Sequence, residues 1–484
     1  MPQPDTEGAG PESAEGDGPS PYEHWGVLVQ TSNVRAAHVA NGIVQLMRLA
    51  PSGPPGWRGV EPRDYVASAV AALRQGWPDK WDLLPAAHAL AVVKNKQGAL
   101  RLDVEAAAGQ PSLMRIGRDH VAKHFAVDGG VLRPDMHRVI SAVLNADNKV
   151  LESGGSDPTT PGFALVGYTP THTLAGMHAA TFLGALCATD VGCEAFAGLY
   201  ELVRDIGDSH SSFARALRIE SAADGLPATI SASSVRDAYP LPSGPGWDAW
   251  AQQVGGLTSN LMRWSASGAS KPETLMAIVD LASLLLSLRI LRWEPQAHRA
   301  SRVLLAIGAA RAGASLGHAI AKAQESLRLA ATAVETAAQR LNLLRSPRAD
   351  APNLTADDDL RKAKRSPSVH ALNLGAAGGW LFPLDSRGGS KRYVRPGPRQ
   401  LVTLTHALMG PQEEMSWADF ASKSLELGLV FGGGREHETE RALCIGGVAA
   451  TLRDVARETR EHLVELGLAR RESDDVVVVD GGIQ

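Results

Sequence analysis

Cysteine is scarce in this sequence, since its 484 residues include only Cys187, Cys193 and Cys444. Their spacing matches no zinc-binding pattern, and three cysteines cannot build the disulfide framework of a small secreted domain. Cys187 and Cys193 lie among Ala, Gly and Phe residues, a setting typical of small buried side chains. We therefore expect reduced thiols in a cytoplasmic protein.

The N-terminal residues lack an apolar segment. Residues 1–21 consist mainly of Gly, Pro, Ser, Glu and Asp, with neither a basic stretch nor an apolar core of the kind found in a signal peptide. Such a composition cannot offset the entropy lost on ordering, so a disordered acidic tail is predicted here. Neither secretion nor membrane insertion is expected.

A large net charge is also missing, because the formal charge at pH 7 is only −4. The acidic residues that precede the first Lys or Arg are Asp5, Glu7, Glu12, Glu15, Asp17 and Glu23. The rest of the chain is therefore slightly positive. A chain so close to neutral does not have the overall charge that indicates a nucleic-acid binder.

No complete nucleotide-binding motif is present. The three glycines at residues 432–434 follow an apolar run, but the Lys-Ser/Thr pair of a P-loop and the glycine spacing of a dinucleotide-binding fold are absent. The glycine-rich residues 375–379 lack the same features. Both segments are predicted to be turns, so no cofactor is expected, and neither an ATPase nor a dehydrogenase is supported.

The strongest signal lies in residues 270–345, where two long helices are predicted. The first begins with a Ser-x-x-Glu capping box at Ser270, has proline in its first turn, and ends near Glu294. A helix without a polar face is buried, in protein or in lipid. Its apolar run is shorter than the ~20 residues of a membrane span and is bracketed by Asp280 and Arg289, so burial in protein is predicted.

The second helix carries a heptad seam in which bulky residues alternate with alanine, so that a neighbouring helix can approach closely. The seam residues are Leu316, Ile320, Ala323, Leu327, Ala330, Val334, Ala337, Leu341 and Leu344. We predict a strut of about 40 Å in the core, at about 1.5 Å per residue.

Composition divides the chain into five segments. They are the tail (1–21), a mixed α/β unit (22–152), a helical domain with the long central helices (163–345), a linker (346–368) and a C-terminal domain (369–484). In the mixed unit we predict a helix over residues 33–49 and a hairpin from residues 89–93 and 100–104. The predicted fold class is mainly α and multidomain, with a central bundle of long helices.

The C-terminal domain is predicted to be winged-helix-like α+β. The expected elements are strands at 380–383 and 392–395, helices at 398–409, 416–427 and 451–466, and a strand at 476–479. Gly467 provides the stop after the last helix. A terminal helix followed by a β-wing is the order of a winged-helix domain, and it also fits an unrelated α+β tail.

Basic residues cluster in this domain and are candidate nucleic-acid ligands. Lys391, Arg392, Arg395 and Arg399 belong to the predicted hairpin, and Arg470 and Arg471 lie at the base of the predicted wing. Release of counterions from phosphate groups would favour binding to such a surface. The same residues would also suit an acidic partner protein, or simply solvent. The acidic wing tip, with Glu472, Asp474 and Asp475, suits docking on protein.

Histidines provide the alternative function, a metal-dependent hydrolase. His120, His124 and Asp128 are spaced to share one helical face, and His172, His178, Asp208 and His210 form a second group. Val121 stands where the zinc-protease motif has Glu, and no nucleophile with a partnered base is evident. Surface or packing roles are the other reading, so no metal ligand or catalytic residue is assigned.

Three segments of the C-terminal part resemble accessory proteins of prokaryotic anti-phage systems, of the methylation-associated type. They are residues 372–381 (LNLGAAGGWL), the pair Arg392-Tyr393, and Phe420 with residues 428–433 (GLVFGG). The resemblance implies a subunit that works beside a methyltransferase, nuclease or ATPase, and it implies no catalytic residues. We therefore expect a non-catalytic accessory or adaptor subunit of a DNA-directed complex in anti-phage defence, with other protein subunits and DNA as partners and no membrane association.

Overall fold

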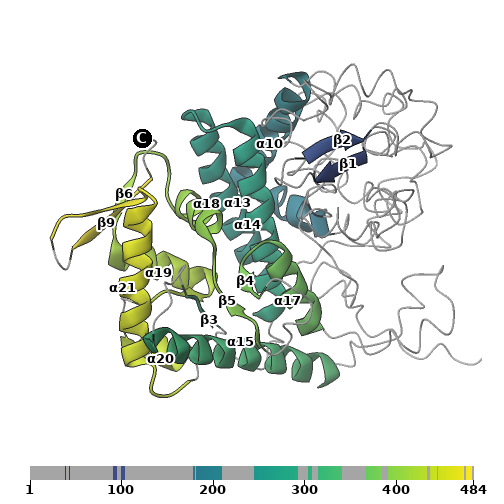
Figure 1. Ribbon diagram of the computed structural model, residues 1–484. Helices are drawn as coiled ribbons and strands as arrows, with labels where there is room; N and C mark the ends of the chain where they lie inside the picture. Colours follow the sequence, from purple (N-terminus) through teal and green to yellow (C-terminus); the bar gives the residue numbers. More distant parts are fainter. Residues whose placement is uncertain are drawn as a thin grey trace, which may run out of the picture.

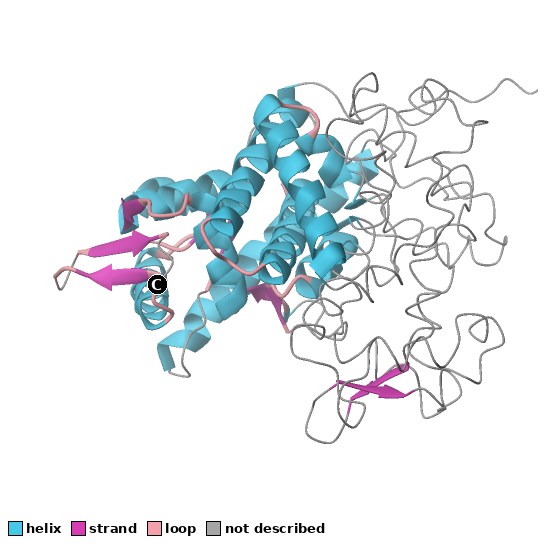
Figure 2. Cartoon of the chain, turned by 90° about the horizontal axis from the view of Figure 1, so that it is seen from above, coloured by secondary structure: helices cyan, strands magenta, loops and turns pink. Residues whose placement is uncertain are grey.

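The structure is a computed structural model of the chain. It describes residues 39, 43, 91–94, 100–103, 178–179, 181–209, 245–292, 303–307, 314–340, 367–383, 391–432, 436–443, 445–473 and 476–481. Helices dominate these residues and the strands are short, which confirms the mainly α fold class (Figures 1 and 2).

Helix α14 (Lys271–Leu291) runs through the middle of the helical core (Figure 1). The Ser270 Oγ accepts a hydrogen bond from the Glu273 N–H at 3.4 Å and donates one to Glu273 Oε2 at 2.7 Å, so Ser270 is the N-cap of α14, as the predicted capping box requires. Residues 273–291 are long and apolar enough to cross a membrane, and most of this segment is buried inside the protein. The helix ends at Leu291, before the predicted end at Glu294.

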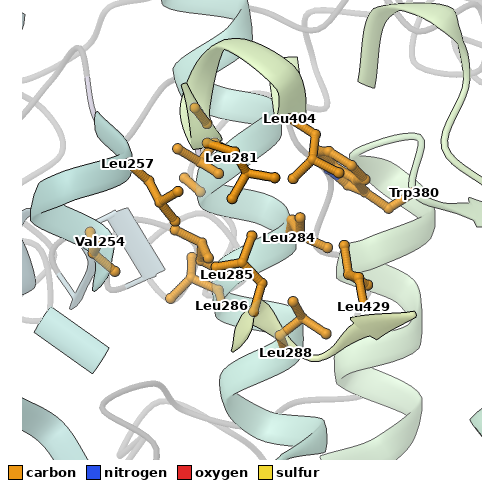
Figure 3. Packing of buried hydrophobic residues seen from close by; sticks show 14 of the residues in the cluster. Val254, Leu257, Leu281, Leu284, Leu285, Leu286, Leu288, Trp380, Leu404 and Leu429 are labelled. Carbon is orange, nitrogen blue, oxygen red and sulfur yellow. The ribbon is translucent and has the colours of Figure 1, made fainter. Parts of the chain in front are cut away.

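Among the described helices, four make the most extensive contacts with α14. They are α10 (Asp190–Ser209), α13 (Pro245–Ala266), α17 (Pro367–Ala377) and α18 (Pro398–Leu408). Figure 3 shows leucines of α14 between Val254 and Leu257 of α13 on one side and Trp380 and Leu404 on the other. Helices from both halves of the chain therefore pack against a continuous apolar surface on α14. Helix α10 continues through Gly207, because one glycine costs a helix only about 1 kcal/mol.

The second predicted long helix is α15 (Ala314–Arg340), whose 27 residues span about 40 Å at the α-helical rise. The seam residues that are buried include Ala323, Leu327, Ala330, Val334 and Ala337, as the heptad pattern predicts. Helix α15 packs against α17, α14 and the short strand β3 (Leu304–Leu305). The seam is therefore covered by several neighbours rather than by one partner helix.

Short strands join the middle of the chain to its C-terminal part. Strand β3 runs parallel to β7 (Leu429–Val430), with Leu304 opposite Leu429, and Ala306 forms a parallel bridge to Val394. Val394 belongs to β5 (Tyr393–Val394), which pairs antiparallel with β4 (Leu381–Phe382) and confirms the predicted pairing of these two segments. One hydrophobic cluster contains residues from both sides of the predicted 346–368 linker. Of that linker only Pro367 and Ser368 are described, and they form the start of α17.

The remaining elements form what we call the helix–wing module, residues 398–481. After α18 come β6 (Glu414–Ser416), α19 (Trp417–Leu427), α20 (Glu436–Leu443), α21 (Ala449–Glu465), β8 (Ala469–Arg471) and β9 (Val477–Asp480). The strands make an antiparallel sheet in the order β6-β9-β8, with Met415 and Ala469 both opposite Val479. In Figure 1, α21 and this sheet form one edge of the molecule.

Few residues of the predicted N-terminal unit are described. Strands β1 (Ala91–Lys94) and β2 (Leu100–Asp103) form the predicted hairpin, with Ala91 opposite Asp103. Val39 and Ile43, from the predicted helix over residues 33–49, are helical and buried in the main cluster. The predicted tail, residues 1–21, lies outside the described residues.

Candidate nucleic-acid interface

The β4–β5 pair places its predicted ligands in three different surroundings. Arg392 is only 4% exposed, and its Nη1 donates a hydrogen bond to Asn373 Oδ1 at 2.8 Å. It therefore lies in the interior rather than on the predicted surface. Lys391 is exposed, and the Arg395 guanidinium stands 5.1 Å from the ring centroid of Phe382.

Arg399 belongs to a polar cluster built around Asp280 of α14. The Arg399 Nε is 2.6 Å from Asp280 Oδ2, and its Nη2 donates to Asp280 Oδ1 at 2.9 Å. Gln400 Nε2 donates to the same carboxylate at 3.3 Å, and Trp380 Nε1 donates to the Asp280 carbonyl oxygen at 2.8 Å. Burial raises the pKa of Asp280 to about 7, although the charge of Arg399 and the hydrogen bonds oppose this.

Glycines of the segment 375–379 allow this cluster to form. A Cβ at Gly378 would meet Ser283 of α14 at 2.7 Å, and one at Gly379 would meet Gln400 Nε2 at 2.5 Å. Gly375 lies within α17, where a Cβ would come within 3.0 Å of Ser287 Oγ. Gly375 is therefore helical rather than part of a turn. These glycines permit close packing of α17 and the residues after it against α14 and Gln400.

The arginines at the base of the wing lie on a different sheet from the β4–β5 group. Arg470 binds Glu414 through two bonds of 2.5 and 2.7 Å and also pairs with Glu472 at 3.2 Å. Its hydrogen bonds to Glu414 raise the pKa of Arg470 and lower the pKa of Glu414. Arg471, the next residue, is exposed. The structure therefore does not bring the six predicted ligands onto one surface, and Arg470 is already neutralised by carboxylates.

Helix α21 carries basic residues outside the six predicted ligands. Arg453 and Arg457 are exposed and Arg460 is half-buried, while Leu452, Val455 and Leu463 are buried. Arg457 pairs with Asp454 at 3.0 Å. The sequence does indicate a basic helix face here, because Arg453, Arg457 and Arg460 are spaced four and three residues apart and such positions share one face of a helix.

Only part of the histidine groups falls in the described residues. His178 and His370 are fully buried, their Nε2 atoms are 2.6 Å apart and their rings stack at 4.8 Å, so one imidazole donates to the other. His120, His124, Asp128, His172 and His210 lie outside the described residues, as does the side chain of Asp208. Within the described part of the chain, no group of three or more His, Cys, Asp or Glu side chains could hold a metal ion.

The remaining candidates, the cysteines and Gly432, make contacts that are typical of structural residues. Cys187 is buried, and the Cys193 thiol donates to the Cys187 carbonyl oxygen at 3.7 Å. Gly432 has a φ of +74° and lies against the Leu452 carbonyl of α21, as expected for a turn.

Comparison of the chain with protein-family models, curated proteins and solved structures found no match. The arrangement of side chains described above therefore provides the basis for a functional proposal.

Proposed function

We propose that this protein is a non-catalytic adaptor subunit of a DNA-directed complex, and that its helix–wing module contacts DNA. The resemblance of residues 372–381 and 428–433 to accessory proteins of anti-phage systems adds the biological context of the proposal. Other subunits of such a complex would provide the catalytic activity.

The order of elements in the helix–wing module is the observation that carries this proposal. Helix α18, strand β6, helices α19 and α21, and the strands β8 and β9 follow one another as in winged-helix domains, with α20 inserted before α21. The sheet order β6-β9-β8 places the last two strands as a hairpin after α21. In such domains the helix before the wing enters the major groove and the wing touches the backbone.

The charges on α21 define how the module would bind. Arg453, Arg457 and Arg460 provide phosphate ligands on its outward side, and Arg471 provides one on the wing. Asp454 and Glu458 lie within ion-pair distance of Arg457, at 3.0 and 4.0 Å. Phosphates would have to compete with these carboxylates, so we expect weak binding that does not depend on sequence and decreases with added salt.

A second candidate, docking of the module on a partner protein, is favoured by the surroundings of Arg470. Glu414, Glu472 and Asp480 all lie within 4 Å of its guanidinium, so this basic residue adds little positive field at the wing. A surface of mixed charge fits a protein surface of complementary charge better than a uniform row of phosphates.

Titration of labelled duplex DNA separates the two candidates. We would compare the wild type with Arg453→Glu/Arg457→Glu and with each single reversal at low and moderate salt, with Arg328→Glu, an exposed charge reversal on α15, as the control for the single reversals. Loss of each phosphate contact should lower the salt slope of binding by about 1. Arg392→Glu is unsuitable, because it would bury a carboxylate.

The proposal predicts that the α21 variant binds more weakly and the control binds like the wild type. Absence of wild-type binding, or binding that ignores both salt and the α21 reversal, would reject DNA contact and leave protein docking as the role of the module.

A further inference from the structure

Asp280 is a carboxylate in the middle of α14, a long apolar helix that is almost entirely buried. Its side chain is only 3% exposed. Arg289, the other charged residue of this buried stretch, follows nine residues later and therefore points to the opposite side of α14. There it stacks on Trp247 and Trp250 at 4.8 and 4.7 Å. Asp280 must find its charge partner on another element.

That partner is Arg399, which comes from the first turn of α18. The Arg399 side chain is 52% exposed, yet its Nε and Nη2 reach inward to both oxygens of Asp280. The carboxyl also accepts a hydrogen bond from the uncharged Gln400 of α18, and the Trp380 indole N–H binds the backbone carbonyl oxygen of Asp280. Among the described residues, Arg399 is the charged group that acts on Asp280.

We infer that Asp280 and Arg399 form a proton-sensitive lock between α14 and α18. The ionised carboxylate is stable in the core only while Arg399 binds it, and uptake of one proton from solvent by Asp280 weakens that ion pair and frees the guanidinium for the surface. This inference does not depend on the proposed contact with DNA.

The protonation of Asp280 determines how this contact changes stability with pH. Burial favours the neutral carboxyl, whereas Arg399 favours the carboxylate, and burial is the larger effect. The folded protein therefore holds this proton more tightly than the unfolded chain does. The stabilisation from the neutral carboxyl is fully present below the unfolded pKa of about 4 and is lost as pH rises through about 7. Above that pH, Arg399 limits the loss.

A mutant cycle measured at two pH values tests the lock. Melting temperatures of the full-length wild type, Arg399→Ala, Asp280→Asn and the double variant are compared at about pH 5.5 and about pH 8.5. Removing one partner of a buried pair leaves an uncompensated charge, so Arg399→Ala should lower the melting temperature by roughly 5 °C or more at the higher pH. At the lower pH the loss should be much smaller.

In the Asp280→Asn background, Arg399→Ala should have little effect at either pH. Other titrating groups cancel in these differences, and Arg470→Ala, which breaks an exposed ion pair, is the control for loss of an arginine. An equal effect of Arg399→Ala at both pH values, or an undiminished effect in the Asp280→Asn background, would overturn the inference. If Arg399→Ala does not fold at the higher pH, folding of the double variant supports the lock and its failure to fold rejects it.

Discussion

Ser326 of α15 is hydrogen-bonded to the backbone of Leu305 in β3. Its Oγ accepts the Leu305 N–H at 3.1 Å and donates to the carbonyl oxygen of Val303 at 3.2 Å. All three residues are buried. A side chain within the heptad helix thus satisfies the backbone of the strand that joins the middle of the chain to β7 and β5.

Replacement of Ser326 by alanine should destabilise the protein. The buried Leu305 N–H would lose its partner, and an unsatisfied buried donor costs about 1–3 kcal/mol. Chemical denaturation of Ser326→Ala would measure the loss, with Thr332→Ala on the exposed side of α15 as the control. Equal midpoints for both variants would show that the bridge contributes nothing measurable.

Enlarging the seam of α15 should also be costly. Ala330 is 4% exposed, so Ala330→Leu would overpack the seam and lower the free energy of unfolding by roughly 1–3 kcal/mol. Ala321→Leu makes the same change at an exposed position of the helix and should be tolerated. An unchanged or higher melting temperature for Ala330→Leu would contradict the close-packed seam.

Gly432 should not tolerate a side chain. Its φ is +74°, and a Cβ would collide with the backbone carbonyl of Leu452, so Gly432→Ala combines backbone strain with a clash. We expect a lower melting temperature and less soluble protein. Gly446→Ala is the control, because a Cβ there meets no atom within 4 Å. Similar behaviour of the two variants would argue against the close approach of Gly432 to α21.

Stability should depend on pH through His406 as well. Its ring is buried and stacks on Trp264 at 4.4 Å, and burial lowers its pKa to about 4, against a weaker opposing effect of Asp480. The unfolded chain therefore binds this proton more readily, so the contribution of His406 to stability is lost as pH falls from about 6.5 toward about 4.

The His406→Asn variant has no imidazole at this position to bind a proton. The difference in denaturation midpoint between wild type and His406→Asn should therefore change in favour of the variant as the pH is lowered. Asp280 shifts stability in the opposite direction over part of this range, but it is present in both proteins and cancels. A difference that stays constant with pH would contradict the assignment.

Removal of residues 1–21 should leave folding intact. This segment contains no run of apolar side chains that could form part of a core, so its loss should remove little hydrophobic burial. Melting temperature and yield of soluble protein for the shortened chain would test the expectation. A clear decrease in either would show that the segment packs against the rest of the protein.

Much of the helical structure could be predicted from local patterns. The Ser270 N-cap, the burial of α14 and the alternation of Ala330 with Val334 depend on residues within a few positions of one another. The pairing of β4 with β5 and the terminal order of α21, β8 and β9 were also predictable, because turns and strands alternate over short distances. Such features are encoded by periodicity and capping, which act locally.

The surroundings of the candidate ligands could not be predicted from the sequence. A cluster of basic residues indicates how much charge is present, but burial and pairing depend on contacts between distant segments. Arg392 is buried and hydrogen-bonded to Asn373, Arg399 forms an ion pair with Asp280 of α14, and Arg470 forms one with Glu414. None of these partners could be inferred from spacing along the chain.

The sequence by itself determined that this protein is mainly helical, with an apolar central helix and a small-residue seam in the next one, because side-chain periodicity selects helices and their buried faces. Only the tertiary structure decided that β3 pairs with β7 and that residues before and after the predicted linker share one core. It also decided which arginines are neutralised. The reason is that desolvation and ion pairing depend on which surfaces meet in space, and that is settled only when the whole chain packs.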